Sequence, residues 1–260
     1  MALRLNVLKK DGFQKKLISP ENSDLKYLSF SYYFGLNKRT IEEYTANQEW
    51  LWVLLSGKME IRTNSGISGM MQRKNVFEEK PASFYISPKS YYTIEMGEET
   101  EAIAVSAPAQ GDFTSFFIRP DSIKKARAGK LNYQRSIFDI MTQEFPASKI
   151  IAGETIHDVG HWSCFPPHKH DCDNMPEESK HEELYFFKFE PEKTGFGMIR
   201  IYDETQDIAF PILTNDLITI PRGYHPVGVI PEHKLYYFWA LAGEKRQFQR
   251  HTHPDYLKYE

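Results

Sequence analysis

The feature that most limits the fold is an internal repeat whose two copies lie half a chain apart. The segment FYISPKSYY (84–92) matches LITIPRGYH (217–225), an offset of 133 residues. Each copy has an apolar strand followed by proline, a cation, a small residue and tyrosine. At nearly the same offset, QEWLWVLLSG (48–57) resembles HEELYFFKFEP (181–191). The repeat indicates a duplicated unit, and 260 residues are enough for two domains of about 130.

Short runs of aromatic and β-branched residues occur throughout both halves. Gly, Pro, Asn and Asp separate these runs, a pattern typical of antiparallel sandwiches and barrels. Helical patterns are restricted to ENSDLKYL (21–28) and SIFDIMTQEF (136–145). The sequence therefore predicts an all-β chain of two tandem antiparallel β-barrel or jelly-roll domains with a few short helices. The expected domains are residues 1–135 and 136–260.

Histidine is distributed unequally between these two halves. All nine histidines lie beyond residue 156, and histidine is the commonest neutral metal ligand. His168 and His170 are one residue apart, so on an extended strand both imidazoles face the same side. Glu183 opens the next predicted strand, and His225 follows a proline–glycine turn. Three imidazoles and a carboxylate can bind one divalent ion and leave positions for a substrate.

The segment that leads to His225, residues 215–225, has residues suited to its expected geometry. Asn215 stands where a positive φ is expected, Pro221 ends the strand, and Gly223 lets the backbone turn His225 inward. In the first copy of the repeat, Tyr92 stands where the second copy has His225. We therefore expect a first domain without metal ligands and a second domain that binds the metal.

Composition excludes several classes of partner. A net charge of −3 gives no reason to expect nucleic acid or an anionic membrane as a partner. No apolar run is long enough to span a bilayer, and the amino terminus lacks a signal-peptide core. The only cysteines, Cys164 and Cys172, imply no disulfide framework. Both are expected to be small free thiols that are buried or half-buried, with redox activity or metal binding as the alternatives. A cytoplasmic protein is predicted, with a homodimer possible through exposed strands.

These motifs resemble the cupin superfamily and, more narrowly, the bicupin 5-deoxy-glucuronate isomerases of inositol catabolism. The resemblance rests on HWSCFPPHKHD (161–171), HEELYFF (181–187), IPRGYHPVG (220–228) and LYYFWALAG (235–243), with LLSGKMEI (54–61) in the first half. It implies a two-barrel enzyme that converts 5-deoxy-D-glucuronate to 5-dehydro-2-deoxy-D-gluconate with one divalent metal ion per chain. The implied ligands are His168, His170, Glu183 and His225. Zinc is the first expectation, and Mn, Fe, Co and Ni accept the same donors.

The sequence departs in places from the patterns it resembles. Asn215 replaces the glycine of the general cupin motif. Ile199 stands beside Arg200 where the isomerase family usually has Gln-Arg, and Trp239 replaces an asparagine. The last two changes fall near the expected pocket, so they bear on which sugar acid is bound.

Aldose–ketose isomerisation needs a group that moves a proton and a cation that binds the substrate carboxylate. The candidate proton-transfer residues are Glu182, His181 and Tyr185. Because Glu182 and Glu183 are adjacent on a strand, only one of them can face inward, and Glu183 is the better candidate for a ligand. Arg200 and Arg222 are the candidate carboxylate ligands, and Tyr202 shares a strand face with Arg200.

Two other functions are compatible with the same residues. Three histidines and a glutamate can hold Fe(II) in a cupin dioxygenase, and a bicupin can bind a sugar without turning it over. The cationic residues expected near the pocket favour a small sugar acid as substrate.

Overall fold

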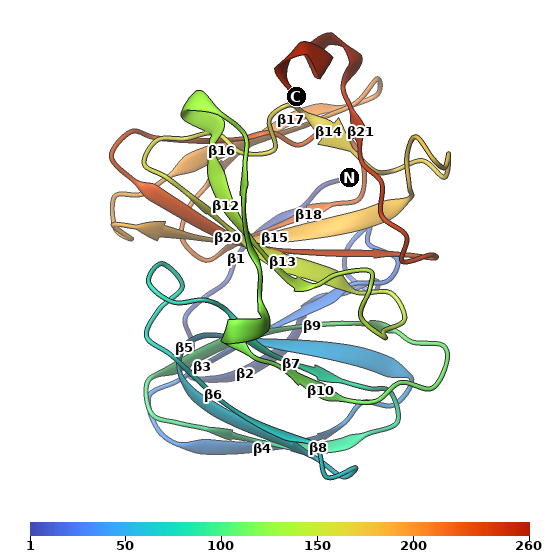
Figure 1. Cartoon of the computed structure of the whole chain (residues 1–260). Coiled ribbons are helices and arrows are strands. Elements are labelled where there is room, and N and C mark those ends of the chain that lie inside the picture. Colours follow the sequence, from blue (N-terminus) through green and yellow to red (C-terminus); the bar gives the residue numbers. More distant parts are fainter.

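The computed structural model describes residues 1–260, and its two halves are stacked one above the other (Figure 1). The first half forms a nine-stranded sheet, with strand order β10-β7-β5-β9-β3-β2 and with β4, β6 and β8 attached. The long strand β5 pairs first with β7 and β9 and then with β6 and β8, so the sheet folds over itself. The bounds of these strands are β2 Gly12–Ile18, β3 Ser29–Gly35, β4 Arg39–Tyr44, β5 Gln48–Thr63, β6 Ser68–Arg73, β7 Ala82–Ile86, β8 Tyr91–Met96, β9 Thr100–Pro108 and β10 Phe116–Ile118.

The second half has a seven-stranded sheet, a three-stranded sheet and a two-stranded ribbon. Their strand orders are β1-β18-β15-β20-β13-β12-β11, β17-β16-β19 and β14-β21. The bounds are β1 Arg4–Asn6, β11 Lys125–Ala128, β12 Arg135–Met141, β13 Ile151–His157, β14 His168–Lys169, β15 His181–Glu190, β16 Gly197–Tyr202, β17 Asp207–Ile212, β18 Asp216–Ile220, β19 Val227–Val229, β20 Lys234–Gly243 and β21 His251–Thr252.

Sheet membership differs from the expected ranges 1–135 and 136–260. Strand β11 and Arg135 belong to the second sheet, and β1 crosses from the amino terminus to pair with β18. The change between sheets falls in the segment between β10 and β11, which contains the short 3-10 helix η1 (Pro120–Ser122). Thus the change of sheet falls before residue 135, and one strand, β1, joins the sheet of the second half from the amino terminus.

Three hydrophobic clusters correspond to this architecture. One cluster lies inside each half, and the largest, with 29 buried residues, lies between the halves. Phe30 and Phe186 stack there across the interface, with ring centroids 5.4 Å apart. Tyr92, which occupies the repeat position of His225, is buried in the core of the first half. Side chains thus fill the space in the first half where the second half has its histidines.

Two glutamates at equivalent positions of the repeat cross the interface in opposite directions. Glu49 accepts backbone N–H groups from the second half at 2.7–2.8 Å, namely those of Ser148, Lys149 and Ile150. Glu182 accepts backbone N–H groups from the first half at 2.5–2.8 Å, namely those of Lys26, Tyr27 and Leu28. The shared role pairs Glu49 with Glu182 in the repeat, which supports duplication.

Both helices expected from the sequence are absent. Residues 21–28 form turns and loops, and most of 136–145 lies in strand β12. Along β12, Phe138 and Ile140 enter the core between the halves, while Ile137 and Asp139 lie on the other face, half-buried. The helical segments are η1, η2 (Leu131–Tyr133) and η3 (Pro254–Tyr259), and none has the length and apolarity needed to span a membrane.

Candidate active site

Four predicted donors gather in the second half, and different elements position them. His168 lies in β14, His170 follows that strand, Glu183 is in β15, and His225 is in the connection between β18 and β19. Glu183 Oε2 lies 3.2 Å from His170 Nε2 and 3.3 Å from His225 Nε2. The ring centroids of His168 and His225 are 5.0 Å apart. The structure thus brings together side chains that are far apart in the sequence.

The imidazoles share one hydrogen-bonding arrangement. Each Nδ1 lies 2.9–3.4 Å from a backbone carbonyl oxygen, those of Pro166, His181 and Gly223 respectively. A carbonyl oxygen only accepts, so each Nδ1 carries the proton and each Nε2 keeps its lone pair. The Nε2 atom of His225 is buried and has no hydrogen-bond partner. A buried, unpaired acceptor of this kind fits coordination to a cation.

The segment 215–225 that leads to His225 has the backbone geometry expected from the sequence. Asn215 has φ +65° and Gly223 has φ +95°. A Cβ at Gly223 would lie 2.9 Å from the carbonyl oxygen of Tyr202, so the position requires glycine. The N–H of Gly223 also donates to Asp171 Oδ2 at 2.8 Å. These contacts fix the direction in which His225 leaves the turn.

The donors also tune one another electrostatically. Burial alone would raise the pKa of Glu183, but the neighbouring imidazoles of His170 and His225 lower it to about 2. Burial would lower the pKa of His170, but the hydrogen bond and charge of Glu183 raise it. Burial, reinforced by the neighbouring His225, holds the pKa of His168 well below its ordinary value. At neutral pH the cluster therefore offers a carboxylate and a neutral His168 to a metal.

Zinc affinity is expected to fall in acid because a proton on His170 competes with the ion. The raised pKa of His170 places the onset above the ordinary histidine value of about 6.5. Below that onset, the apparent affinity should drop about tenfold per pH unit, since one proton leaves for each ion bound. Competition with a chromophoric chelator between pH 8 and pH 5 measures this dependence. An affinity that stays constant over this range would exclude His170 as a ligand.

The donor cluster adjoins a cavity of about 330 Å³, a volume suited to a small molecule. Glu183 and His168 line it together with Tyr185, Tyr237 and Trp239. Trp239 lies over Gly153, where a Cβ would come within 2.3 Å of the indole ring. Of the two departures from the family pattern near the expected pocket, Trp239 therefore shapes the cavity, whereas Ile199 is buried in the core.

Cys164 is buried next to the donors, as expected of a small free thiol, while Cys172 is exposed. The Sγ atom of Cys164 lies within 4.8 Å of the nearest donor nitrogens of His168 and His225. His225 belongs both to this group and to the group with His170 and Glu183. The tyrosine expected to act in catalysis, Tyr185, lines the cavity and contacts Cys164 Sγ through its hydroxyl at 3.2 Å.

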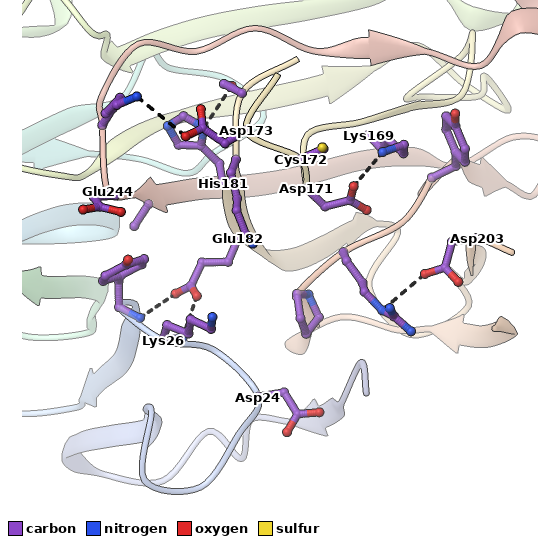
Figure 2. A pocket seen from close by; sticks show the side chains of 18 of the residues that line it. Asp24, Lys26, Lys169, Asp171, Cys172, Asp173, His181, Glu182, Asp203 and Glu244 are labelled. Carbon is purple, nitrogen blue, oxygen red and sulfur yellow. Dashed lines mark hydrogen bonds and ion pairs between the residues drawn. The ribbon is translucent and has the colours of Figure 1, made fainter. Parts of the chain in front are cut away.

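The other two candidate bases lie outside this cavity. Glu182 and His181 line a separate, larger pocket of about 1150 Å³ (Figure 2). Because adjacent strand residues face opposite sides, Glu182 points away from Glu183 and toward the first half, where backbone N–H groups occupy its carboxylate. The ring of Phe248 packs against the imidazoles of both His170 and His181. Of the three candidates for proton transfer, Tyr185 thus lines the cavity beside the donors, whereas Glu182 and His181 line the larger pocket.

The three predicted substrate-binding residues also lie elsewhere. Arg200 and Tyr202 share a face of β16, as expected, but this face is the outer one, and Arg200 forms an exposed bidentate ion pair with Asp207 at 2.8 Å. Arg222 pairs with Asp203 at 3.3 Å and, like Tyr202, lines the larger pocket. The inner face of β16 carries Ile199 and Ile201, so an apolar core occupies the place expected for Arg200.

Sequence reasoning missed three charged residues that line the cavity, namely Arg135, Asp139 and Arg250. Arg135 and Asp139 lie on β12, and the helix expected over residues 136–145 covers Asp139 and begins directly after Arg135. The alternation of Arg135, Ile137 and Asp139 against Ser136, Phe138 and Ile140 is the strand signal that identifies this face. Burial raises the pKa of Asp139. Arg250 comes from the carboxy-terminal segment, where no motif distinguishes it.

Sequence comparison relates residues 6–259 to the KduI/IolB family. A 5-deoxy-glucuronate isomerase of Geobacillus kaustophilus is 32% identical over 243 residues, which cover 92% of this chain and 88% of the relative. The Bacillus subtilis strain 168 protein of the same name is 30% identical over 242 residues, covering 91% of this chain and 89% of the relative.

Solved structures show the same fold. An IolB-like protein from Salmonella typhimurium LT2 superposes with a TM-score of 0.92 at 24% identity, covering 99% of this chain and 98% of that chain. Lactobacillus farciminis oxalate decarboxylase, solved as a formate complex, gives a TM-score of 0.70 at 11% identity over 99% of this chain and 90% of that chain. These similarities confirm the predicted all-β bicupin architecture. Given a family match across nearly its whole length, the chain belongs to the KduI/IolB family.

Proposed function

We propose that this protein is a metal-dependent aldose–ketose isomerase that converts 5-deoxy-D-glucuronate to 5-dehydro-2-deoxy-D-gluconate in inositol catabolism. One observation carries the proposal: a cluster of imidazole and carboxylate donors adjoins a small cavity that is also lined by Arg135 and Arg250. Donors for a cation beside positive charge for a carboxylate match the two ends of a sugar acid. The names of the relatives point to the same substrate.

The donor set fits a divalent ion. His168, His170, Glu183 and His225 would hold it, with the Nδ1 protons engaged by backbone carbonyls, so that each Nε2 atom can bind the ion. When bound, the ion supplies positive charge that stabilises negative charge on the sugar oxygens. Zinc, manganese, iron, cobalt and nickel all accept these donors, and we propose zinc first.

Tyr185 is the candidate from the sequence that shares the cavity with the donors. Burial raises the pKa of Tyr185 well above its ordinary value, so its hydroxyl stays protonated near neutral pH. It can therefore donate a hydrogen bond to a substrate oxygen on which charge develops. In this position Tyr185 acts as a donor and not as a base.

Tyr185→Phe is expected to lower kcat about 10²-fold, the usual cost of removing one donor to a developing oxyanion. The ring contacts with Phe187 and Tyr237 remain possible for phenylalanine, so the melting temperature and zinc content should change little. Tyr202→Phe, outside the cavity, serves as the matched control. Steady-state kinetics that show equal kcat for both variants would remove Tyr185 from the mechanism.

The isomerisation itself is tested by ¹³C NMR of 5-deoxy-D-glucuronate incubated with zinc-loaded protein. The account predicts growth of a ketone carbonyl signal as the aldehyde carbon is consumed, and loss of this conversion after the metal is chelated. Oxygen consumption with an aromatic or diketone substrate would instead identify a dioxygenase. Binding without any conversion would identify a sugar-binding protein.

We also propose a small sugar acid as the physiological partner, a cytoplasmic location and a possible homodimer. Strands at the sheet edges could support pairing of two copies.

A further inference from the structure

Three cationic side chains are buried in this protein, and Arg73 is the one that has an anionic partner. Arg73 forms a bidentate ion pair with Glu154 at 2.7–2.8 Å. Lys149 donates to the carbonyl oxygen of Gly243 at 3.4 Å and lies 4.7 Å from the ring centroid of Tyr27. Arg135 is 5% exposed. Its Nη1 donates to the carbonyl oxygen of Tyr133 at 3.2 Å.

The remaining N–H groups of Arg135, on Nε and Nη2, have no hydrogen-bond partner, and no carboxylate lies within 4 Å of the guanidinium. Arginine is rarely buried without an anionic partner, because desolvation of an unpaired charge costs several kcal/mol. Since Arg135 lines the 330 Å³ cavity, its unpaired groups can be reached by a ligand. The cavity is thus a place where an anion would be favourably bound.

The charged and titratable groups around Arg135 are already engaged or too distant to be its partner. His157 lies opposite Arg135 in the β12–β13 pairing, and burial lowers its pKa to about 3, so it is neutral. Glu183 is bonded to His170. Asp139 is four residues along the same strand, about 13 Å away at the usual strand rise.

The other groups on the cavity wall are no better suited to neutralise Arg135. Burial raises the pKa values of Cys164, Tyr185 and Tyr237, so these groups stay uncharged. His168 and Arg250 are the remaining titratable residues of the lining, and neither can supply an anion. The missing counter-charge has to come from a bound molecule.

We propose that Arg135 binds the carboxylate of the sugar acid and thereby selects hydroxy acids over neutral sugars. This inference rests on the proposed function and assigns one end of its substrate. The guanidinium presents two adjacent N–H directions, which match a carboxylate in a bidentate arrangement. Because His168 and Glu183 line the same cavity, the carbonyl end of the substrate then lies toward the donor cluster. Arg135 thereby takes the role that the sequence suggested for Arg200 and Arg222.

The test compares binding of 5-deoxy-D-glucuronate with 5-deoxy-D-glucose, which carries a hydroxymethyl group in place of the carboxylate. Isothermal titration calorimetry on the zinc-loaded full chain should show at least about tenfold tighter binding of the acid by the wild type. Arg135→Met should lose this preference and raise KM for the acid about 10-fold to 100-fold, with a smaller change in kcat. Arg200→Met, which removes an exposed arginine, should leave binding and kinetics unchanged.

Arg135→Lys provides a second variant that keeps the charge but not the paired N–H groups. It should fold even if Arg135→Met does not, and it should retain part of the preference for the acid. A preference for the acid that is undiminished in both variants overturns the inference. If the wild type binds the acid through Arg135 but never converts it, the isomerase proposal fails while this inference stands. If the wild type converts the acid and both variants keep full selectivity for it, the isomerase proposal stands and the inference about Arg135 fails.

Discussion

His225→Ala is expected to lower kcat/KM about 10³-fold and to reduce the bound zinc to a small fraction of one ion per chain. His225 is the donor common to both groups of potential ligands, so its loss weakens every arrangement around the ion. The charge stabilisation that a metal supplies is worth several kcal/mol, and each 1.36 kcal/mol corresponds to a factor of ten in rate. Elemental analysis and initial-rate kinetics on the same preparation measure both effects.

His233→Ala is the matched control, because His233 bonds to Thr194 in an exposed position outside the cavity. It should keep the zinc content and the activity of the wild type. Equal activity and metal content in His225→Ala and His233→Ala would show that His225 is not a ligand that matters for catalysis.

Glu154→Ala is expected to destabilise the protein by about 3–5 kcal/mol, because it leaves the guanidinium of Arg73 buried without its counter-charge. Both side chains of this pair are 0% exposed, and Tyr236 also donates to Glu154 at 2.8 Å. Residues Arg73 and Glu154 come from different halves, so the loss falls at the interface between them. Urea denaturation with a single-transition analysis measures the change.

Two comparisons make this result specific to the buried pair. Asp207→Ala removes the partner of Arg200 in an exposed pair, with side chains 51% and 61% exposed, and should cost less than about 1 kcal/mol. The double variant Arg73→Met with Glu154→Leu removes both charges and should recover most of the stability. If Glu154→Ala and Asp207→Ala had equal small effects, the ion pair would not contribute to holding the halves together.

The repeat and the strand period predicted most of what the structure shows. Because alternate residues of a strand share a face, His168 and His170 are predicted to point to the same side. Because adjacent residues face opposite sides, only one of Glu182 and Glu183 can point inward, and Glu183 is the one predicted. The duplication predicted two similar halves. The loss of histidine from the first copy agrees with the apolar core that contains Tyr92.

Alternation tells which residues share a face but not which face is inward. For this reason Arg200 and Tyr202 were correctly grouped on β16 and wrongly directed toward the cavity. Residues 136–145, which include Asp139 and follow Arg135, have the pattern of a helix in the sequence, because apolar residues on both faces of β12 obscure the period of a strand. The hydrogen-bond partners of the Glu182 carboxylate could not be predicted for another reason. They are backbone N–H groups of residues 26–28, which belong to the other half of the chain.

Anomalous X-ray diffraction from zinc-soaked crystals, recorded on both sides of the zinc edge, tests the central claim most directly. The account predicts one strong peak within coordination distance of the Nε2 atoms of His168, His170 and His225 and of the Glu183 carboxylate. A peak bound instead through Cys164 without His170 and Glu183, or no peak in the second barrel at all, would contradict it.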